Sequence, residues 1–165
     1  MRLALDIVLV FTACWAVATD LRSQRIPNWL TFGAAGAALG IRLALGGAQA
    51  LLAGSEAWLL GAAIFFIPFA LGWMGAGDVK LLAAFGALGG PAFLVQAALA
   101  GCLAGGLIAF VYLAWQRRLI FFMWHVFVHF RHPFSGVLEG KRRIPYGPAL
   151  ALGAMGTMLM STVAH

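Results

Sequence analysis

The segment LLAAFGALGGPAFLVQAALAGCLAGGLIAFVYLAWQ, from Leu81 to Gln116, carries no formal charge and decides how the chain folds. One straight helix of that length would extend about 54 Å at ~1.5 Å per residue. That is nearly twice the ~30 Å hydrocarbon core of a bilayer. Its middle holds Gly89-Gly90-Pro91, a combination that breaks helices. We therefore predict two membrane crossings joined at this tripeptide.

Four further apolar segments are long enough to cross a bilayer as helices. The segment nearest the N-terminus contains one acid, Asp6, and the next contains Arg42 near its far end, where the side chain could snorkel. Residues 46–56 lack Lys and Arg and are predicted to form a short loop outside the cytoplasm. The four predicted spans are residues 3–19, 29–45, 57–74 and 144–165.

The composition agrees with a membrane location. Of 165 residues, 63% are hydrophobic and only 10% charged, and the mean hydropathy is +0.95. Soluble domains are about 45–50% apolar and about 25% charged. These values exclude a soluble, disordered, collagenous or disulfide-rich protein. The predicted fold is an all-α integral membrane protein, a polytopic bundle of about six transmembrane helices that forms one domain over residues 1–165.

Basic residues set the predicted orientation of this bundle. The net charge is +6, but the basic side chains lie between apolar segments rather than along one face, which favours membrane topology over nucleic-acid binding. With six crossings the basic loops share one side of the membrane, the cytoplasmic side, and both chain ends lie outside. The residues concerned are Arg22, Arg25, Lys80, Arg117, Arg118, Arg131 and Lys141-Arg142-Arg143.

Three local features receive structural interpretations. Ala16-Val17-Ala18 resembles a signal-peptidase site, but Asp6 interrupts the apolar run, so we expect the first helix to be retained. Residues 119–130 are too short to span and are predicted to lie in the cytoplasmic interface. Cys14 and Cys102 lie in apolar runs without a metal-binding spacing and are read as small hydrophobic residues.

Two acids stand out because ionisable groups beside the hydrocarbon are functional candidates. Asp20 closes the first predicted span, and Asp78 ends the motif Gly75-Ala76-Gly77-Asp78. Two crossings separate them, so both are expected at the cytoplasmic interface. A carboxylate pair on separate helices suits aspartic-type hydrolysis, in which one group accepts a proton from water and the other polarises the carbonyl. Two close carboxyl groups would titrate as a unit.

Neighbouring residues suit this use. Gly75 and Gly77 permit positive φ and close approach, and Pro27 begins the next helix beside Asn28, whose side chain can satisfy backbone groups. The helix macrodipole favours a negative charge at a helix N-terminus, so Asp78 is expected to be the ionised partner and Asp20 the protonated one.

With these motifs the chain resembles the prepilin leader peptidases, Gly-x-Gly-Asp aspartic proteases of bacterial inner membranes. The resemblance rests on Asp20 followed by Ile26-Pro27-Asn28, and on Gly75-Ala-Gly-Asp-Val-Lys80. Pro145-Tyr-Gly-Pro-Ala-Leu-Ala-Leu-Gly153 resembles the last span of that family. The similarity extends over essentially the whole chain.

The resemblance implies a function. It implies cleavage of the short basic leader of type IV prepilins and pseudopilins, after a Gly at the cytoplasmic face, with Asp20 and Asp78 as the catalytic pair. Gly75, Gly77 and Lys80 would be supporting positions, as would Pro27 and Asn28 of the first motif. The partners would be a prepilin and membrane lipid, with no cofactor, metal or nucleic acid. Full-length members have an N-terminal CxxC region and methylate their product. This chain has no CxxC and resembles the short Tad (Flp) pilus peptidases, so peptidase activity is expected and the sequence does not decide methylation.

Other functions were weighed against this one. The four serines lack a Gly-x-Ser-x-Gly context, which argues against a serine protease. His125, His129 and His132 could share a helical face, but no Cys or carboxylate completes a metal site. A small carrier or channel that uses Asp20 and Asp78 as ion sites remains an alternative, as does a non-catalytic pilus assembly factor.

Overall fold

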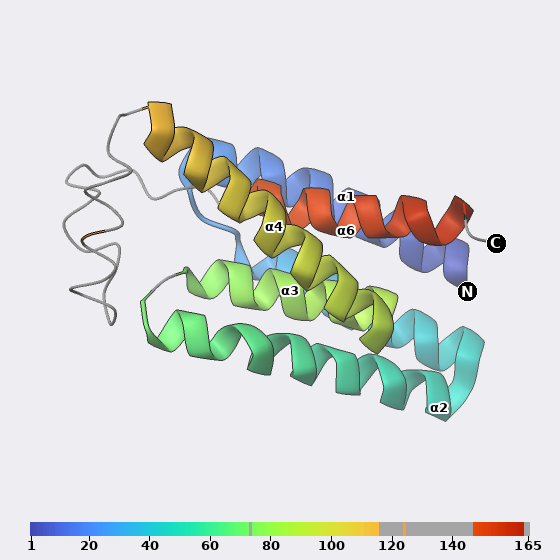
Figure 1. Ribbon diagram of the computed structural model, residues 1–165. Coiled ribbons are helices and arrows are strands. Elements are labelled where there is room, and N and C mark those ends of the chain that lie inside the picture. Colours follow the sequence, from blue (N-terminus) through green and yellow to red (C-terminus); the bar gives the residue numbers. More distant parts are fainter. Residues whose placement is uncertain (73, 116–123, 125–146, 164–165) are drawn as a thin grey trace.

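A computed structural model describes residues 1–72, 74–115, 124 and 147–163 of the chain. Within these residues all regular structure is helical, as the sequence predicts. The helices pack side by side, and the two chain ends lie at the same end of the bundle (Figure 1). They are α1 (Arg2–Ser23), α2 (Asn28–Ala70), α3 (Ala76–Gly89), α4 (Pro91–Trp115) and α6 (Gly147–Val163).

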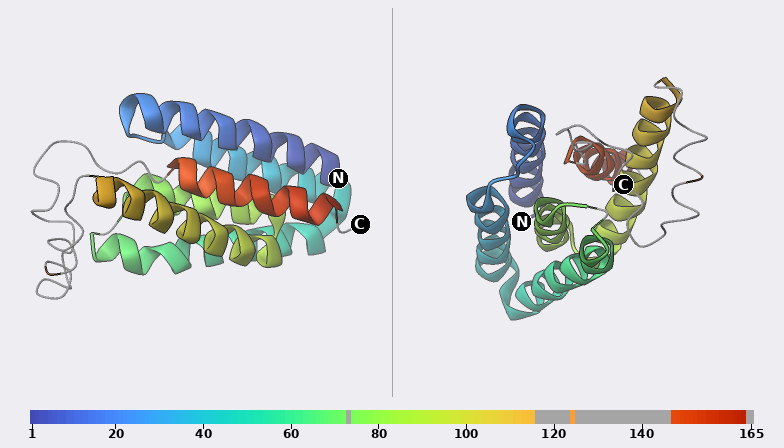
Figure 2. Two further views of the ribbon diagram at one scale, coloured as in Figure 1. Left: turned by 45° about the horizontal axis from the view of Figure 1, so that its top comes forward. Right: turned by 90° about the vertical axis from the view of Figure 1, so that its left-hand side faces the viewer.

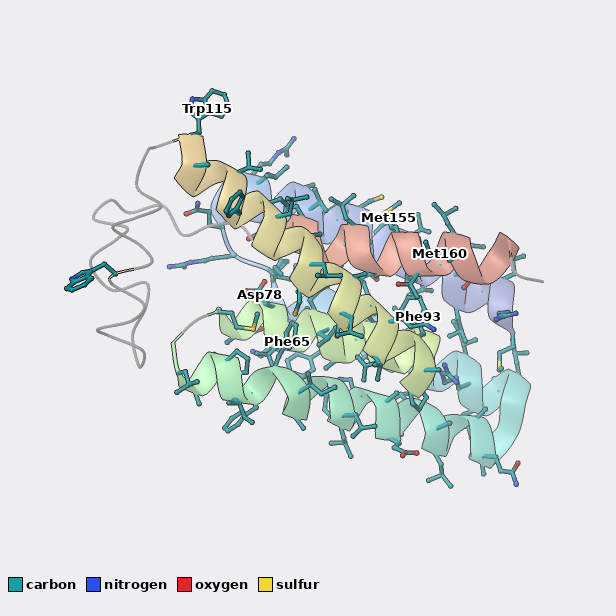
Figure 3. All side chains as sticks on the ribbon, in the orientation of Figure 1. Phe65, Asp78, Phe93, Trp115, Met155 and Met160 are labelled. Carbon is teal, nitrogen blue, oxygen red and sulfur yellow. The ribbon has the colours of Figure 1, made fainter. Side chains whose placement is uncertain are left out.

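The helices present an apolar exterior. Three of them contain stretches long and apolar enough to cross a membrane: α1, α2 and residues Pro91–Ile108 of α4. Large apolar side chains point away from the bundle, among them Trp115 and Met160, which are 87% and 78% exposed (Figure 3). Such a surface is suited to lipid and not to water. The prediction of an all-α membrane protein is confirmed at this level, and the number of six spans stays a prediction.

Helix α2 consists of two arms that meet at Gly47. This residue has φ 70° and ψ −166°, a backbone conformation that favours glycine. The chain doubles back there, so that residues 28–46 and residues 48–70 lie as separate helical arms (Figure 1). The turn returns the chain to the end of the bundle from which α2 starts.

The chain reverses inside the predicted loop over residues 46–56, but the predicted length of that loop is wrong, because only Gly47 departs from helical geometry. The residues that follow it are mostly Ala, Leu and Gln, which favour helix strongly. The Ser55 hydroxyl donates to the Leu51 carbonyl at 2.9 Å, as a serine within a helix does. Glu56 is therefore an exposed side chain on the second arm of α2 and not a loop residue.

The break predicted at Gly89-Gly90-Pro91 is confirmed. Helix α3 ends at Gly89, Gly90 has φ 87°, and α4 begins at Pro91. Proline suits the first position of a helix because its missing N–H would have no helical partner there. The turn thus forms for the reason that the sequence suggests.

Helix α3 lies inside the bundle, with the other helices around it (Figure 2). Every residue from Leu81 to Leu88 is buried. The second arm of α2 packs closely against α3, because a Cβ on Gly61 would lie only 2.8 Å from the Ala83 Cα. Phe65, from the same arm, fills the contact with a side chain that is 3% exposed (Figure 3).

Several predictions from the sequence fall outside the described residues. These are the interfacial segment over residues 119–130 apart from residue 124, the three histidines at 125, 129 and 132, and the basic cluster at 141–143. The last predicted span, residues 144–165, corresponds to α6 over its described part.

Candidate active site

One end of the bundle gathers the chain segments that carry the sequence motifs. The last turn of α1 and the first turns of α2, α3 and α6 all lie there, opposite the chain ends (Figure 1). Asp20 belongs to that last turn of α1. Asp78 projects from the first turn of α3 (Figure 3). The structure therefore brings both predicted aspartates to the same end of the bundle.

Asp20 is the more enclosed of the two acids. Its side chain is 6% exposed, and its Oδ2 accepts a hydrogen bond of 3.0 Å from the Gly147 N–H. A Cβ on Gly147 would lie 2.8 Å from that same oxygen, so only glycine leaves room for the carboxyl group. This contact joins the first helix of the chain to the first residue of α6.

Asp78 is held by the backbone at the start of its own helix. Its Oδ2 accepts a hydrogen bond of 3.2 Å from the Gly75 N–H, and its own N–H donates to the Gly75 carbonyl at 3.1 Å. The side chain is half-buried. A carboxylate in the first turn of a helix is stabilised by the helix dipole and by the unpaired N–H groups there.

The glycines of the second motif act by close approach. Of the two properties that glycine allows here, positive φ is not used at Gly75 or Gly77; the described residues with positive φ are Gln24, Gly47, Gly72 and Gly90. A Cβ on Gly77 would instead lie 3.2 Å from the Ile26 Cβ. The residue beside Asp78 thus packs directly against the first motif.

A polar contact joins the same two motifs. The Lys80 ammonium donates to Asn28 Oδ1 at 2.9 Å and lies 5.4 Å from the centre of the Phe32 ring. Asn28 was expected to satisfy backbone groups, and here its side-chain oxygen accepts from a lysine. Together with the contact between Ile26 and Gly77, this hydrogen bond fixes the start of α3 against the start of α2.

The arrangement offers two carboxyl groups at one end of the bundle. Among the described residues no group of three His, Cys, Asp or Glu side chains is placed to hold an ion. The hydrogen bond from Gly147 to Asp20 was not predicted from the sequence, although the segment around Gly147 resembles the last span of the family. A glycine and a proline together at the start of an apolar span was the only signal available for it.

Comparison with known proteins supports the motif interpretation. A family model described as the type IV leader peptidase family matches residues 7–110. The matched region includes Asp20 and Asp78, and it ends before Gly147. Comparisons with curated proteins and with solved structures gave no match.

Proposed function

The chain belongs to the type IV leader peptidase family, and from that premise we propose that it is an aspartic endopeptidase with Asp20 and Asp78 as its catalytic pair. Family membership makes it a membrane peptidase of prepilin leaders. The observation that carries the aspartic mechanism is the position of both carboxyl groups, on different helices, at one end of the bundle.

In this mechanism one aspartate acts as a general base and the other as a general acid. In the first step the ionised carboxylate takes a proton from water while the water oxygen bonds to the scissile carbonyl carbon. The protonated carboxyl gives its proton to the carbonyl oxygen. When the C–N bond breaks, the first group returns its proton to the leaving nitrogen, and the second recovers its own from the hydroxyl. Both acids end in their starting states.

We assign the ionised role to Asp78 and the protonated role to Asp20. Asp78 accepts from the Gly75 N–H in the first turn of α3, where the helix dipole favours negative charge. Asp20 lies in the last turn of α1, where the dipole disfavours it. The Gly147 N–H occupies Oδ2 of Asp20, which leaves Oδ1 as the oxygen to carry the proton.

The site is proposed to face the cytoplasm of a bacterial cell, in its inner membrane. Three basic residues follow the two aspartates closely in the sequence: Arg22 and Arg25 after Asp20, and Lys80 after Asp78. Basic residues of membrane proteins concentrate on the cytoplasmic side. Counting the two arms of α2 separately, the helices would give six crossings. A prepilin would present its basic leader at this face and lay its apolar segment against the bundle, with cleavage after the leader glycine.

The test is cleavage of a prepilin by the full chain in membranes. We expect Asp20→Asn and Asp78→Asn each to lower the rate at least about 1000-fold, because either change removes one half of the proton transfer. Asp6→Asn and Glu56→Gln are matched controls, since they change acids elsewhere on α1 and α2 and are expected to stay within about twofold. Normal cleavage by both Asn variants at wild-type protein levels would refute the proposal and favour a carrier or an assembly factor.

A further inference from the structure

A buried arginine lies at the end of α3 that is opposite to Asp78. Arg42 comes from the first arm of α2 and is 8% exposed, although its position near a span end predicted snorkelling toward the interface. Its Nε donates to the Ala87 carbonyl at 2.7 Å, and its Nη2 donates to the Leu88 carbonyl at 2.9 Å. The snorkelling prediction is therefore wrong, because the guanidinium is buried within the bundle and donates to backbone carbonyls of α3.

The carbonyls need such a donor because α3 is short. Its 14 residues extend about 21 Å, which is less than the ~30 Å hydrocarbon core. The last four carbonyls of a helix have no helical partner. A membrane helix shorter than the hydrocarbon core cannot place both of its ends in water, so carbonyls at an end within the core need donors from the protein. The Gly90 N–H donates to the Gly86 carbonyl at 2.8 Å, and Arg42 donates to the carbonyls of Ala87 and Leu88.

The guanidinium is also held from its other sides. A Cβ on Gly54, in the second arm of α2, would lie 3.0 Å from Arg42 Nε. A Cβ on Gly90, in the turn before α4, would lie 3.6 Å from Nη2. Arg42 is thus enclosed by both arms of α2 and by the α3–α4 turn. A planar group with two fixed hydrogen bonds cannot follow a helix that slides along its axis.

We propose that Arg42 is a positioning residue that sets the depth of α3 and so brings Asp78 level with Asp20. Helix α3 is one continuous helix whose residues Leu81 to Leu88 are buried. Its position at the Leu88 end therefore determines its position at the Asp78 end. Misplacement of a reacting group by about 1 Å can lower a rate about 100-fold. The catalytic part of this inference rests on the proposed function; the structural part, the depth of α3, does not.

The depth can be measured without activity. In a chain with Cys14 and Cys102 replaced by Ala, the pair Ile26→Cys and Gly77→Cys reports the position of α3, because the two Cβ atoms would lie 3.2 Å apart and disulfides need Cβ atoms about 3.5–4.5 Å apart. A second pair, Gly101→Cys and Leu150→Cys, joins α4 to α6 and serves as the control for an intact bundle. The rate of disulfide formation under a mild oxidant is the readout.

Three substitutions then separate position from charge. Arg42→Gln removes the guanidinium and its two hydrogen bonds. Arg42→Lys keeps the positive charge but not the planar geometry. Arg2→Gln removes one exposed positive charge from the same end of the bundle. We expect Arg42→Gln to slow formation of the 26–77 disulfide at least about fivefold and to leave the 101–150 disulfide unchanged. In the chain without added cysteines it should lower kcat at least about tenfold with KM unchanged. Arg42→Lys should lie between, and Arg2→Gln should match the wild type.

Each outcome decides the proposal. Unchanged 26–77 cross-linking in Arg42→Gln overturns it, and so does slower cross-linking without a fall in kcat. If Arg42→Gln does not accumulate, Arg42→Lys decides by the same two readouts. If the wild-type chain cleaves no prepilin, the proposed function fails, and cross-linking alone decides whether Arg42 sets the depth of α3.

Discussion

The two ends of α3 hold opposite kinds of polar group. At its start, Asp78 accepts from the Gly75 N–H and remains half-buried. Beside it, Gly77 packs against Ile26, and Lys80 donates to Asn28. At its end, the Arg42 side chain donates to two carbonyls and is buried. Both groups match the helix dipole, negative at the N-terminus and positive at the C-terminus. The two groups differ in what they contact: the Asp78 carboxyl accepts from the backbone at the start of its own helix, whereas Arg42 joins the end of α3 to another helix.

Among the contacts that hold the helices and the site together, the largest effect is predicted for the hydrogen bond between Gly147 and Asp20. Gly147→Ala places a Cβ within 2.8 Å of Oδ2 and forces the carboxyl group away from the Gly147 N–H. Prepilin cleavage in membranes should fall about 100-fold, the size expected for a displacement of about 1 Å. Gly156→Ala is the control, because no atom lies within 4 Å of its Cβ position. Retained activity in Gly147→Ala would show that this contact does not hold the site.

A smaller effect, on the stability of the fold, is predicted for a substitution that packs against the middle of α3 and leaves the contacts at both of its ends unchanged. Gly61→Ala would bring a Cβ within 2.8 Å of the Ala83 Cα and should destabilise the folded chain by about 1–3 kcal/mol through overpacking. Unfolding in detergent measures the change. Gly36→Ala, which meets no atom within 4 Å, should be neutral. Equal stability of the two variants would contradict the close packing of α2 on α3.

The smallest effect is predicted for the polar contact at the start of α3. Lys80→Met removes the hydrogen bond to Asn28 and the contact with the Phe32 ring, each worth about 0.5–1 kcal/mol at an exposed site. Together the two losses amount to about 1–2 kcal/mol, so cleavage should fall at most about five- to thirtyfold. In a double-mutant cycle, Asn28→Ala should add little to Lys80→Met, because the two changes remove the same bond. Fully additive losses would show that the two side chains act independently.

The sequence predicted those features that local chemistry determines. The break at Gly89-Gly90-Pro91 follows from residues that disfavour helix, and the shared end for Asp20 and Asp78 follows from an even number of crossings between them. The turn at Gly47 lies within the predicted loop over residues 46–56, but that loop was predicted too long, because the Ala and Leu residues after Gly47 favour helix.

The contacts of Arg42 and Gly147 were missed for a different reason. Each depends on a partner far away in the chain, at Ala87 and Asp20 respectively. A single arginine in an apolar span reads as a snorkelling side chain, and a glycine beside a proline reads as a turn. Only the folded bundle brings these partners together, so no local pattern could have identified them.

The central claim, that Asp20 and Asp78 act as one catalytic unit, is tested most directly by comparing the two single Asn variants with the double variant. The measurement is the rate of prepilin cleavage in membranes at matched protein levels. Residues that act as a unit are not additive, so the double variant should be no slower than the slower single variant. Independent losses that multiply in the double variant, or substantial cleavage by either single variant, would contradict the account.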